Sequence, residues 1–391
     1  MNRIVRRVAC GISGGVDSAV AALILKQKGY DVFGLFMQNW DIADETGKCQ
    51  VDKDRDDARM VCSHLKIPFH EVSFVKEYWN DVFLSMVKEY EQGFTPNPDV
   101  MCNKHIKFDA FFHHAIYKLG ADAIATGHYA RTSCGFHLDK VNYNEGVKLL
   151  TAVDSAKDQT LFLSQISQDA LQRTIFPIGD LTKDVVKKIA VQAGLAKIAE
   201  RKESMGICFI GSRNFSKFIE EYIEPTEGDF VHVETGKVVG KHKGTHYWTL
   251  GQRALIGGLS KAFFVVEVHP DTQEVIVAPG TDHPALFSQS FKTELAHWIH
   301  QPPAEFVTSC KFHASFRYQH SHPLIGCTAE KTDADSLVVF LDQPMRAVTP
   351  GQFAVFYQGN ECLGSARITE GGPSFYALNI RNRIKISNDF S

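Results

Sequence analysis

Apolar residues change their spacing along this chain near residue 214. Before that point, short apolar runs alternate with stretches in which apolar residues recur every three or four positions, which predicts alternating strands and helices. Strands are predicted at Val8–Ile12, Val32–Met37, Phe69–Phe74, Asp122–Thr126 and Lys148–Val153. Helices are predicted at Val16–Lys28, Asp52–Leu65, Lys76–Glu91, Asn103–Leu119, Thr160–Gln168 and Thr182–Ala193. This alternation indicates an α/β fold with a doubly wound parallel sheet, which binds ligands at the carboxyl ends of its strands.

After residue 214 the predicted strands are short and turns separate them. A helix is predicted first, at Asn214–Tyr222, followed by strands at Phe230–Val233, Lys237–Gly240, Phe263–Val268 and Glu274–Ala278. Polar and apolar residues then alternate at Thr308–Tyr318, Leu337–Leu341, Ala354–Tyr357 and Glu361–Ile368, which predicts an antiparallel β-barrel. We therefore expect three domains: an α/β nucleotide-binding domain at 1–213, a small central domain at 214–280 and a C-terminal β-barrel at 281–391.

The stretch Gly11–Ser18, Gly-Ile-Ser-Gly-Gly-Val-Asp-Ser, joins the first predicted strand to the first predicted helix. Gly14 and Gly15 let the backbone approach a ligand without Cβ interference, and the first N–H groups of the helix point at that ligand. Ser13 and Ser18 add hydroxyl donors. The loop therefore predicts an anion site, although it is neither a Walker A loop nor a dinucleotide fingerprint.

The alternative is that this stretch is only a helix start, in which Ser13 and Asp17 cap the helix and complement its dipole. Two adjacent glycines flanked by two serines exceed what a cap requires, so we favour the anion site. In such a site Asp17 can hold a Mg²⁺ ion that bridges phosphates.

The composition limits the classes of protein to consider. Of 391 residues, 44% are hydrophobic and 22% are charged, as in soluble globular enzymes, and no apolar run approaches the roughly 20 residues of a membrane helix. The nine cysteines form no Cys-x-x-Cys pair, which favours a reducing compartment over a disulfide framework or a zinc ribbon. The net charge of −3 does not indicate a nucleic-acid binder. Short basic clusters, including those at Lys183–Lys188 and Arg201–Lys202, favour solvated faces over phosphate contacts.

Two cysteines lie in unusual surroundings. In the loop Gly93–Asn103 two prolines two residues apart prevent a helix, and Asp99 and Cys102 share one face if Asp99 begins the next helix. A helix N-terminus lowers a thiol pKa and favours the nucleophilic thiolate, whereas the alternative for Cys102 is a small buried hydrophobe. Cys208 lies in a short apolar run between two glycines, a segment able to carry a reactive thiol in and out of a site.

Other candidates carry weaker signals. Met37 and Gly127 end predicted strands, where an adenine ring would lie, and the alternatives are a core methionine and a turn glycine. The polar triplet at 157–159 would ordinarily be a loop with a helix cap. His320 and His322 resemble a metal pair, but their spacing suits a strand or turn surface. No metal ligand is therefore assigned apart from Asp17 with ATP-bound Mg²⁺.

Four motifs occur in order: Gly-Ile-Ser-Gly-Gly-Val-Asp-Ser at 11–18, Thr-Pro-Asn-Pro-Asp-Val-Met-Cys-Asn at 95–103, Lys-Asp-Gln at 157–159 and Gly-Ile-Cys-Phe-Ile-Gly at 206–211. The first resembles the pyrophosphate loop (PP-loop) of the ATP pyrophosphatases, which cleave ATP between the α- and β-phosphates. Together with Trp248–Arg253, the four resemble the tRNA-specific 2-thiouridylases over nearly the whole chain. The stretch Val75–Phe108 is most similar to the animal mitochondrial members.

This resemblance implies an ATP-dependent tRNA sulfurtransferase with a PP-loop domain, a small central tRNA-binding domain and a C-terminal β-barrel. Such an enzyme adenylates the 2-carbonyl of the wobble uridine and then transfers sulfur from a cysteine persulfide, giving 2-thiouridine, AMP and pyrophosphate. Cys102 would be the nucleophile, Cys208 would carry the persulfide, and Asp99 would shuttle a proton. Either the persulfide attacks the base directly or Cys102 first releases hydrosulfide, and both routes end with a disulfide between Cys102 and Cys208.

The resemblance also assigns ligand-binding residues and partners. ATP, with Mg²⁺, would be bound by Gly11, Ile12, Ser13, Gly14, Gly15, Val16, Asp17, Ser18, Met37 and Gly127. The target base would meet Asn97, Pro98 and Asp99, and tRNA would contact His128, Lys157, Asp158, Gln159, Arg317, Tyr318 and Gln352. The expected partners are wobble-uridine tRNAs for Lys, Glu and Gln and a sulfur-relay protein or cysteine desulfurase, with no membrane. We expect a monomer in mitochondria, with the cytoplasm as the alternative.

Two rival hypotheses stay open at this point. An ammonia-using ATP pyrophosphatase of the synthetase kind needs no paired cysteines, but it usually comes with a glutaminase domain or another ammonia source, and none is visible in the sequence. A tRNA-binding protein with a vestigial nucleotide loop is the other, and the intact Ser13, Asp17 and Ser18 speak against it.

Overall fold

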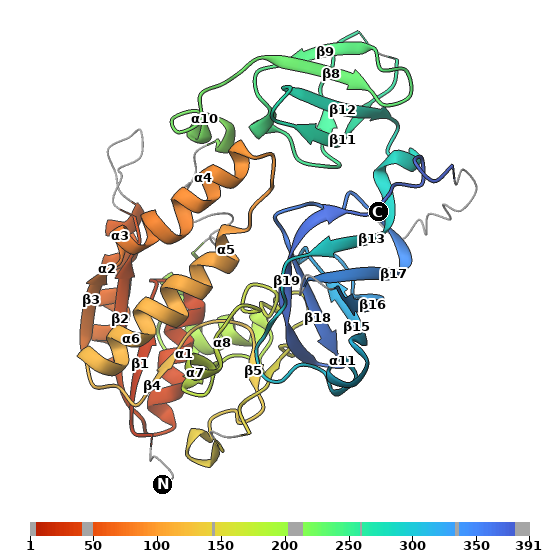
Figure 1. The fold of residues 1–391 in the computed structure, drawn as a ribbon. Coiled ribbons are helices and arrows are strands. Elements are labelled where there is room, and N and C mark those ends of the chain that lie inside the picture. The colour runs from red at the N-terminus through yellow and green to blue at the C-terminus, as the bar shows by residue number, and fades with distance from the viewer. Residues whose placement is uncertain are drawn as a thin grey trace.

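The structure, a computed structural model, describes residues 5–40, 50–142, 145–201, 214–258, 260–332 and 336–379. It has an α/β domain, a small β domain and a β-barrel, which Figure 1 shows from red through green to blue along the chain. The predicted fold class is confirmed. Within the described residues, no helix combines the length and apolar character needed to cross a bilayer.

Five parallel strands form the sheet of the α/β domain, in the order β3-β2-β1-β4-β7. They are β1 (Arg7–Gly11), β2 (Asp31–Gln38), β3 (Phe69–Ser73), β4 (Ala123–Ala125) and β7 (Thr174–Ile175). The central strand β1 is fully buried at Val8, Ala9 and Cys10, as a parallel strand covered on both faces should be. The strand order reverses between β1 and β4, so ligands are expected at the carboxyl ends of these two strands.

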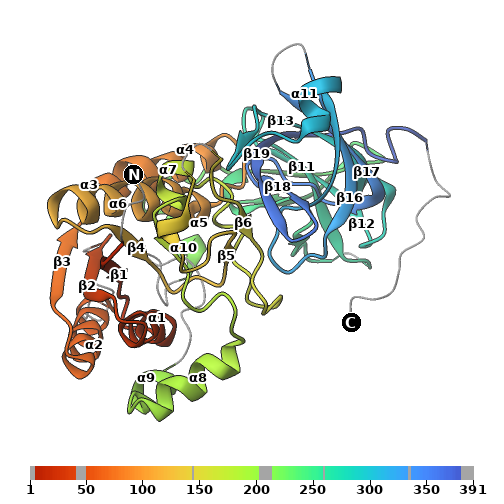
Figure 2. The ribbon, with the colours of Figure 1, turned by 90° about the horizontal axis from the view of Figure 1, so that it is seen from below.

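Helices cover both faces of this sheet (Figure 2). One face carries α1 (Val16–Gln27), α2 (Gln50–Leu65), α8 (Lys183–Gln192) and α9 (Ala196–Ala199). The other face carries a helical hairpin. Its first arm consists of α3 (Val75–Tyr78), the π-helix η1 (Trp79–Phe83) and α4 (Leu84–Glu91). Its second arm consists of α5 (Pro98–Met101), the π-helix η2 (Cys102–Ala110), α6 (Phe111–His113) and the π-helix η3 (His114–Lys118).

The second arm begins earlier than the predicted start at Asn103. The side-chain oxygen of Asn97 accepts a hydrogen bond from the backbone N–H of Val100 at 3.2 Å and caps α5. Pro98 occupies the first helical position, where a missing N–H costs nothing. The predicted helix was therefore too short, because its N-terminal proline was taken only as a helix breaker.

Two other predictions between residues 131 and 171 are wrong. The stretch predicted as a further strand of the parallel sheet forms β6 (Leu149–Leu150), which pairs with β5 (Arg131–Thr132) and with a barrel strand. The helix predicted at Thr160–Gln168 is instead a series of turns, followed by the short helix α7 (Gln168–Leu171). Both segments are fixed by contacts with the barrel, which local periodicity does not report.

The middle domain is a five-stranded sheet that follows the short helix α10 (Phe215–Ile219). Its strands are β8 (Gly228–His232), β9 (Val238–His242), β10 (Arg253–Ala254), β11 (Phe263–His269) and β12 (Glu274–Pro279). β8 pairs in parallel with β12 and the other neighbours are antiparallel.

The remaining short helices are spread over the three domains. They are η4 (Leu138–Lys140), η5 (Thr245–Tyr247), η6 (Pro284–Leu286) and α11 (Ala304–Ser309).

Six antiparallel strands close the C-terminal barrel, in the order β13-β17-β16-β15-β18-β19, because β13 also pairs with β19. They are β13 (Phe287–Thr293), β15 (Lys311–Arg317), β16 (Ile325–Lys331), β17 (Leu337–Arg346), β18 (Phe353–Gln358) and β19 (Glu361–Gly371), and β14 (His297–Trp298) pairs with β19. Closure leaves no barrel edge to be protected.

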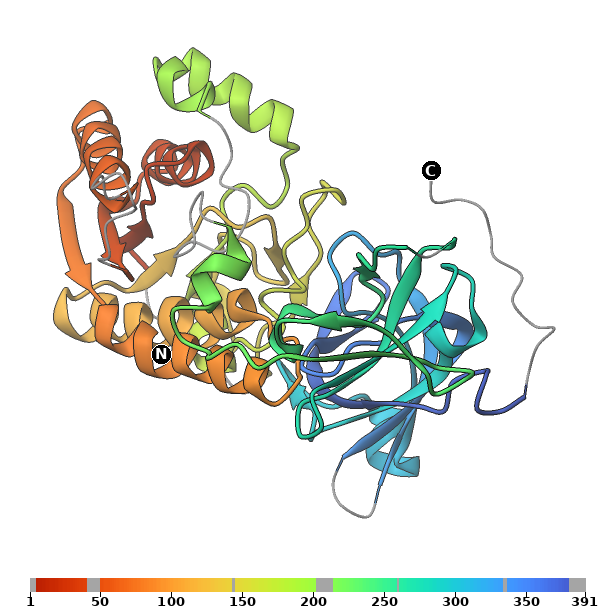
Figure 3. The same ribbon diagram turned by 90° about the horizontal axis from the view of Figure 1, so that it is seen from above.

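A buried ion pair joins the α/β domain to the barrel, and Figure 3 shows these two parts of the chain side by side. Arg317, at the end of β15, donates to Asp158, and their side chains are 10% and 4% exposed. The same carboxylate accepts from the Thr160 hydroxyl at 2.7 Å and from the Ala152 N–H at 2.9 Å. Each buried charge is thus compensated, as it must be in a low-dielectric interior.

Replacing Asp158 with Asn should keep the shape of this contact but leave the Arg317 charge buried without its partner. We expect the stability to fall by about 3 kcal/mol, measured as a lower midpoint of urea unfolding. The control is Asp180→Asn, because Asp180 pairs with Arg131 at 3.5 Å but is 71% exposed, and the loss should stay within about 0.5 kcal/mol. Equal losses in the two variants would contradict the assigned role of the buried pair.

Candidate active site

Hydrogen bonds within the loop after β1 fix its backbone at the start of α1. Gly14 has a φ of +75°, a conformation that glycine adopts without strain. The Ser18 hydroxyl accepts from the Ser13 N–H at 3.2 Å and donates to the Gly15 carbonyl at 3.1 Å. Gly15 is the N-cap residue of α1, and no side chain caps this helix. Capping by Ser13 or Asp17 is therefore not found, although Asp17 lies in the first turn of α1, where a carboxylate complements the helix dipole. The anion site at this turn stays a prediction.

Asp17 is paired within the protein. The ammonium of Lys183, the first residue of α8, lies 2.8 and 2.7 Å from its two oxygens, and the Tyr129 hydroxyl donates to it at 2.9 Å. The Lys183 side chain is only 10% exposed, so its assignment to a solvated basic face was wrong. The pair places a positive and a negative charge beside the loop.

The site is compatible with Mg²⁺ if the ion arrives with ATP. In nucleotide sites Mg²⁺ is commonly held by one or two carboxylates together with phosphate oxygens. Asp17 can supply one carboxylate, but only in exchange for its contact with Lys183. Among the described residues there is no cluster of three or more metal-ligating side chains, so phosphates would have to provide further ligands.

The carboxyl end of β4 contacts the start of α1. A Cβ atom on Gly127 would lie 2.7 Å from the backbone nitrogen of Ser18 and 2.8 Å from the carbonyl carbon of Asp17, so only glycine fits. Met37, near the end of β2, is half-buried. The structure therefore brings Gly127 to the loop from more than a hundred residues away and places Met37 at the end of the strand next to β1.

Arg201 contacts the back of the same loop. Its guanidinium donates to the Gly14 carbonyl at 3.2 Å and to Asp57 of α2 at 3.0 Å, and it also pairs with Asp54. This residue, too, was wrongly assigned to a solvated face. Arg201 thereby joins the loop to α2.

Asp99 and Cys102 lie on consecutive turns of the second helical arm, as predicted for a shared face. Cys102 is 6% exposed, and Asp99 is half-buried in the first turn of α5. Since Cys102 lies one turn beyond the helix start, the N-terminus acts on it less directly than the sequence suggested. From Cys102 onward the helix has π geometry, a local widening that is frequent at functional sites.

A lysine on this π-helix reaches the turn after β4. The Lys107 ammonium lies 3.4 Å from Nε2 of His128, and Nδ1 of His128 lies 2.8 Å from the Thr126 hydroxyl. Burial first, and the Lys107 charge second, hold the pKa of His128 well below its usual value. Burial raises the pKa of the Asp99 carboxyl, and Lys107 acts in the opposite direction. His128 is therefore a neutral ring in this site.

Gln352 of the barrel holds the loop before α5. Its amide nitrogen donates to the carbonyls of Thr95 at 2.7 Å and Pro96 at 3.3 Å, and its amide oxygen accepts from Asn97 at 3.3 Å. The Thr95 hydroxyl also donates to Thr249 of the middle domain at 3.2 Å. All three domains therefore meet at the loop that carries Asn97 and Pro98.

The other residues expected to contact tRNA lie along the joint between the α/β domain and the barrel. Gln159 accepts from the Tyr129 N–H at 3.0 Å, and Lys157 is half-buried beside it. Asp158 and Arg317 are paired, and the buried Tyr318 donates to the Ala347 carbonyl at 3.0 Å. These side chains fix the domain joint, and their contact with tRNA stays a prediction.

Cys208 lies outside the described residues. The described residues before and after 202–213 are held at two points of the site: Arg201 at the Gly14 carbonyl, and Asn214 as the cap of α10. The ring of Phe215 in α10 packs 5.3 Å from that of Tyr90 in α4. The described residues next to this stretch therefore lie at the nucleotide loop on one side and beside the helical hairpin on the other.

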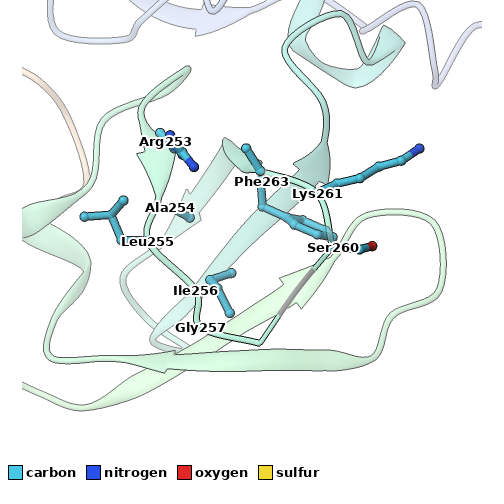
Figure 4. Close-up of a pocket in the computed structure, with 9 residues that line it drawn as sticks. Arg253, Ala254, Leu255, Ile256, Gly257, Ser260, Lys261 and Phe263 are labelled. Atoms are coloured by element: carbon cyan, nitrogen blue, oxygen red, sulfur yellow. The ribbon is translucent and has the colours of Figure 1, made fainter.

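Two other candidates do not join this site. A pocket of about 380 Å³ in the middle domain is lined by Arg253–Gly257 and Ser260–Phe263 (Figure 4), and its lining includes none of the predicted site residues. His320 stacks on Phe162 and its Nε2 lies 2.6 Å from the Asp158 carbonyl. His320 therefore packs at the domain joint. The part of the chain that the structure describes holds no cluster of three or more metal-ligating side chains.

Sequence reasoning missed Lys107, Tyr129, Lys183 and Arg201. Tyr129 directly follows Gly127 and His128, so proximity to assigned residues was an available signal. Lys107 had no local signal, since the contact that marks it joins it to His128, 21 residues away. Lys183 and Arg201 had no local signal, since their partners are 166 and 187 residues away.

Family profiles match the three parts of the chain. The profile described as the tRNA methyl transferase HUP domain matches residues 6–212. The tRNA methyl transferase PRC-barrel domain matches residues 216–279, and the aminomethyltransferase beta-barrel domain matches residues 288–368.

Relatives match over nearly their whole length. The protein named mitochondrial tRNA-specific 2-thiouridylase 1 is 53% identical in Gallus gallus, covering 95% of this chain and 94% of the relative, and 53% identical in Homo sapiens, covering 95% and 92%. The tRNA-specific 2-thiouridylase MnmA of Alkaliphilus oremlandii is 46% identical, covering 93% and 97%.

Gly127→Ala should weaken nucleotide binding, because its methyl group must displace the Asp17–Ser18 peptide from the start of α1. We expect the Kd for ATP to rise about tenfold or more, the equivalent of about 1.4 kcal/mol, in a calorimetric titration without tRNA. Gly257→Ala is the control, since a Cβ there meets nothing within 4 Å. Unchanged ATP affinity in Gly127→Ala would place the nucleotide elsewhere.

Proposed function

We propose how a chain that belongs to the tRNA-specific 2-thiouridylases, and is therefore a tRNA sulfurtransferase, uses this site to convert the wobble uridine of tRNA to 2-thiouridine. The family is ATP-dependent and acts on tRNA. The observation that carries the proposal is the contact between Gly127 and the Asp17–Ser18 peptide. It supports a nucleotide bound where the turn after β4 meets the uncapped start of α1.

We assign the triphosphate of ATP to the loop at 11–18 and the adenine to the strand ends at Met37 and Gly127. The N–H groups of the loop and of the first turn of α1, with the hydroxyls of Ser13 and Ser18, would bind the phosphates. Mg²⁺ arriving with ATP would be held by Asp17 and phosphate oxygens and would supply positive charge for the departing pyrophosphate. Lys183, displaced from Asp17, would then have its ammonium within reach of the phosphates.

The first chemical step activates the base. The wobble uridine, unstacked from the anticodon loop, would lie against Asn97, Pro98 and Asp99. Its 2-oxygen attacks the α-phosphorus of ATP, pyrophosphate leaves, and Asp99 accepts the N3 proton of the base. The 2-oxygen, a poor leaving group before this step, is then part of an AMP leaving group.

The second step transfers sulfur. The terminal sulfur of a persulfide on Cys208 attacks C2 and AMP leaves with the former 2-oxygen. The Cys102 thiolate then attacks the Cys208 sulfur, which breaks the S–S bond to the transferred atom and forms a Cys102–Cys208 disulfide. Alternatively, Cys102 attacks the persulfide first and releases hydrosulfide, which attacks C2. Both orders return the proton from Asp99 to N3 and leave the same disulfide.

The contacts of the described residues on either side of residues 202–213 support this division of labour. The described chain on either side of 202–213 is tethered at the nucleotide loop by Arg201 and beside the helical hairpin by α10. The arrangement thus supports a persulfide donor and a second thiol that share one site.

Binding of tRNA is assigned to the domain joint. We propose that His128, Lys157, Asp158, Gln159, Arg317, Tyr318 and Gln352 line or hold the surface that the anticodon stem-loop approaches. Since Asp158, Arg317 and Tyr318 are buried, their role would be to keep the barrel and the α/β domain at the spacing that the tRNA requires. The substrates would be tRNAs for Lys, Glu and Gln.

The setting of the reaction follows from the relatives. Several are named mitochondrial, so we propose that this enzyme acts in mitochondria. It would act as a monomer and receive its sulfur from a sulfur-relay protein or a cysteine desulfurase.

Incubation of the protein with tRNA, ATP and a persulfide source should produce 2-thiouridine, detected by mass spectrometry of the nucleosides. Cys102→Ser and Cys208→Ser should each reduce it to background while pyrophosphate release continues. Cys310→Ser is the control, because Cys310 is exposed on the barrel. Full thiolation by both active-site variants would refute the sulfur-transfer steps and favour an ammonia-using pyrophosphatase.

Asp17→Ala should abolish activation of the base, because it removes the charge that organises Lys183 and Mg²⁺ at the loop. We expect pyrophosphate release in the presence of tRNA to fall at least about 100-fold, measured in single turnover. Asp31→Ala, in an exposed pair with Arg7 in the same domain, should leave it unchanged. A normal rate in Asp17→Ala would show that the loop is only structural.

A further inference from the structure

We propose that Arg367 of the barrel is a positioning residue of the thiolation site, which holds the loop at 93–97, named here the base-binding loop, and does not contact tRNA phosphates. The inference rests on the assignment of Asn97, Pro98 and Asp99 to the target base proposed above. It gives strand β19 a part in the reaction, because the barrel then fixes the orientation in which the base is received.

The turn between α4 and the base-binding loop is a well-defined unit. The N–H of Gly93 donates to the Tyr90 carbonyl at 3.1 Å, and the N–H of Phe94 donates to the Glu89 carbonyl at 2.9 Å. Gly93 has a φ of +77°, so the two hydrogen bonds form the Schellman motif that ends many helices. Glu89 on the helix and Phe94 in the loop are therefore held together.

Arg367 contacts both of these residues. Its Nη2 lies 2.8 Å from Oε2 of Glu89, and its guanidinium carbon lies 4.9 Å from the centre of the Phe94 ring. Its Nη1 donates to Glu294 of the barrel at 2.7 Å. The side chains of Arg367 and Glu89 are only 20% and 17% exposed, so salt and water screen their attraction less than in a surface pair. Arg367 therefore joins the barrel to the turn.

The barrel holds the base-binding loop at a second point close to Arg367. The Pro350 carbonyl accepts from the Thr95 N–H at 2.9 Å. The Gln352 side chain donates to the Thr95 carbonyl at 2.7 Å. The backbone carbonyl of Gln352 accepts from the N–H of Ile368, the residue after Arg367, at 2.8 Å. One corner of the barrel therefore holds two successive residues of the loop.

The base-binding loop leads directly into the helix that carries Asp99. Only two residues separate Phe94 from Asn97, which caps α5, and Asp99 lies in the first turn of that helix. A displacement of the turn would therefore be passed on to the residues assigned to the base. Misplacement of a reacting group by about 1 Å can lower a rate by about 100-fold. Arg367 is thus placed to affect the rate without touching the substrate.

The alternative is that Arg367 contacts the tRNA backbone, as arginines of nucleic-acid-binding domains often do. Its two Nη atoms already lie beside the carboxylates of Glu89 and Glu294, and its guanidinium lies over the ring of Phe94. Two carboxylates offset its single charge, so this cluster offers no net positive charge to a phosphate. The contacts favour the positioning role.

The experiment measures single-turnover thiolation by the full-length protein with tRNA, ATP and a persulfide source, and the Kd for tRNA at several salt concentrations. Arg367→Met should lower the rate at saturating tRNA about tenfold or more. The affinity for tRNA should change by less than about twofold, with the same salt dependence, because no phosphate contact is lost. Glu89→Gln removes the same pair from the helical side and should lower the rate in the same way.

Further variants test the route by which Arg367 acts. Arg367→Lys keeps a charge beside Glu89 and should restore part of the rate. Glu89→Gln combined with Arg367→Met should be no slower than Arg367→Met alone, because the two side chains act as one pair. ATP affinity without tRNA should be unchanged in all of them. Lys292→Met is the matched control, since Lys292 forms an exposed pair with Glu370 on the barrel at 3.0 Å, and its rate should match the wild type.

Three results would overturn the inference: a normal rate in Arg367→Met, a weaker tRNA affinity with a smaller salt slope, or additive losses in the double variant. Asp99→Asn separates the inference from the reaction scheme. If Asp99→Asn is inactive but Arg367→Met thiolates tRNA normally, the inference fails while the assignment of the base stands. If Asp99→Asn thiolates tRNA at the normal rate, the role of Asp99 at the base is itself refuted.

Discussion

The site depends on one close approach, that of the turn after β4 to the first turn of α1. Gly127 has no room for a Cβ against the Asp17–Ser18 peptide, so the two segments meet backbone to backbone. The residues after Gly127 then follow: His128 reaches Lys107, and Tyr129 reaches Asp17. A side chain at this point would separate the nucleotide loop from the helix that carries Asp99 and Cys102. The steric limit at Gly127 thereby holds the loop after β1 against the turn that reaches Lys107.

Charge is arranged around this contact in compensated pairs. Lys183 neutralises Asp17 on the nucleotide side, and Arg201 joins the back of the loop to the carboxylates of α2. The Asp158–Arg317 pair holds the barrel against the α/β domain. Buried charges without partners would destabilise the fold by several kcal/mol. Most of these pairs can therefore be understood as fixing loops and domains in place, so that the reactive groups need little rearrangement when substrates bind.

Much of the architecture could be predicted from local pattern. The alternation of apolar runs with helical periodicity identified the strands β1 to β4 and the helices α1, α2 and α8, because each buries one face against its neighbours. Prediction failed where the chain leaves that scheme. The stretch around β6 pairs with the barrel strand β19. Pro98 starts a helix, because the first helical position needs no backbone N–H and therefore accepts a proline. Local propensity contains no information about a partner two hundred residues away.

The sequence by itself determined the chemistry available to this protein: a glycine-rich loop with two hydroxyls and a carboxylate, and thiols in motifs whose order identifies the family. Residue type and spacing suffice for this, because they decide which groups can bind phosphate or carry sulfur. Only the tertiary structure decided which charges serve the site. Lys183 and Arg201 looked like solvent-facing residues until the fold brought carboxylates to both of them. The fold also placed the Lys107 ammonium 3.4 Å from Nε2 of His128. The physical reason is that an ion pair depends on distance in space, and folding sets that distance after the sequence has set the charges.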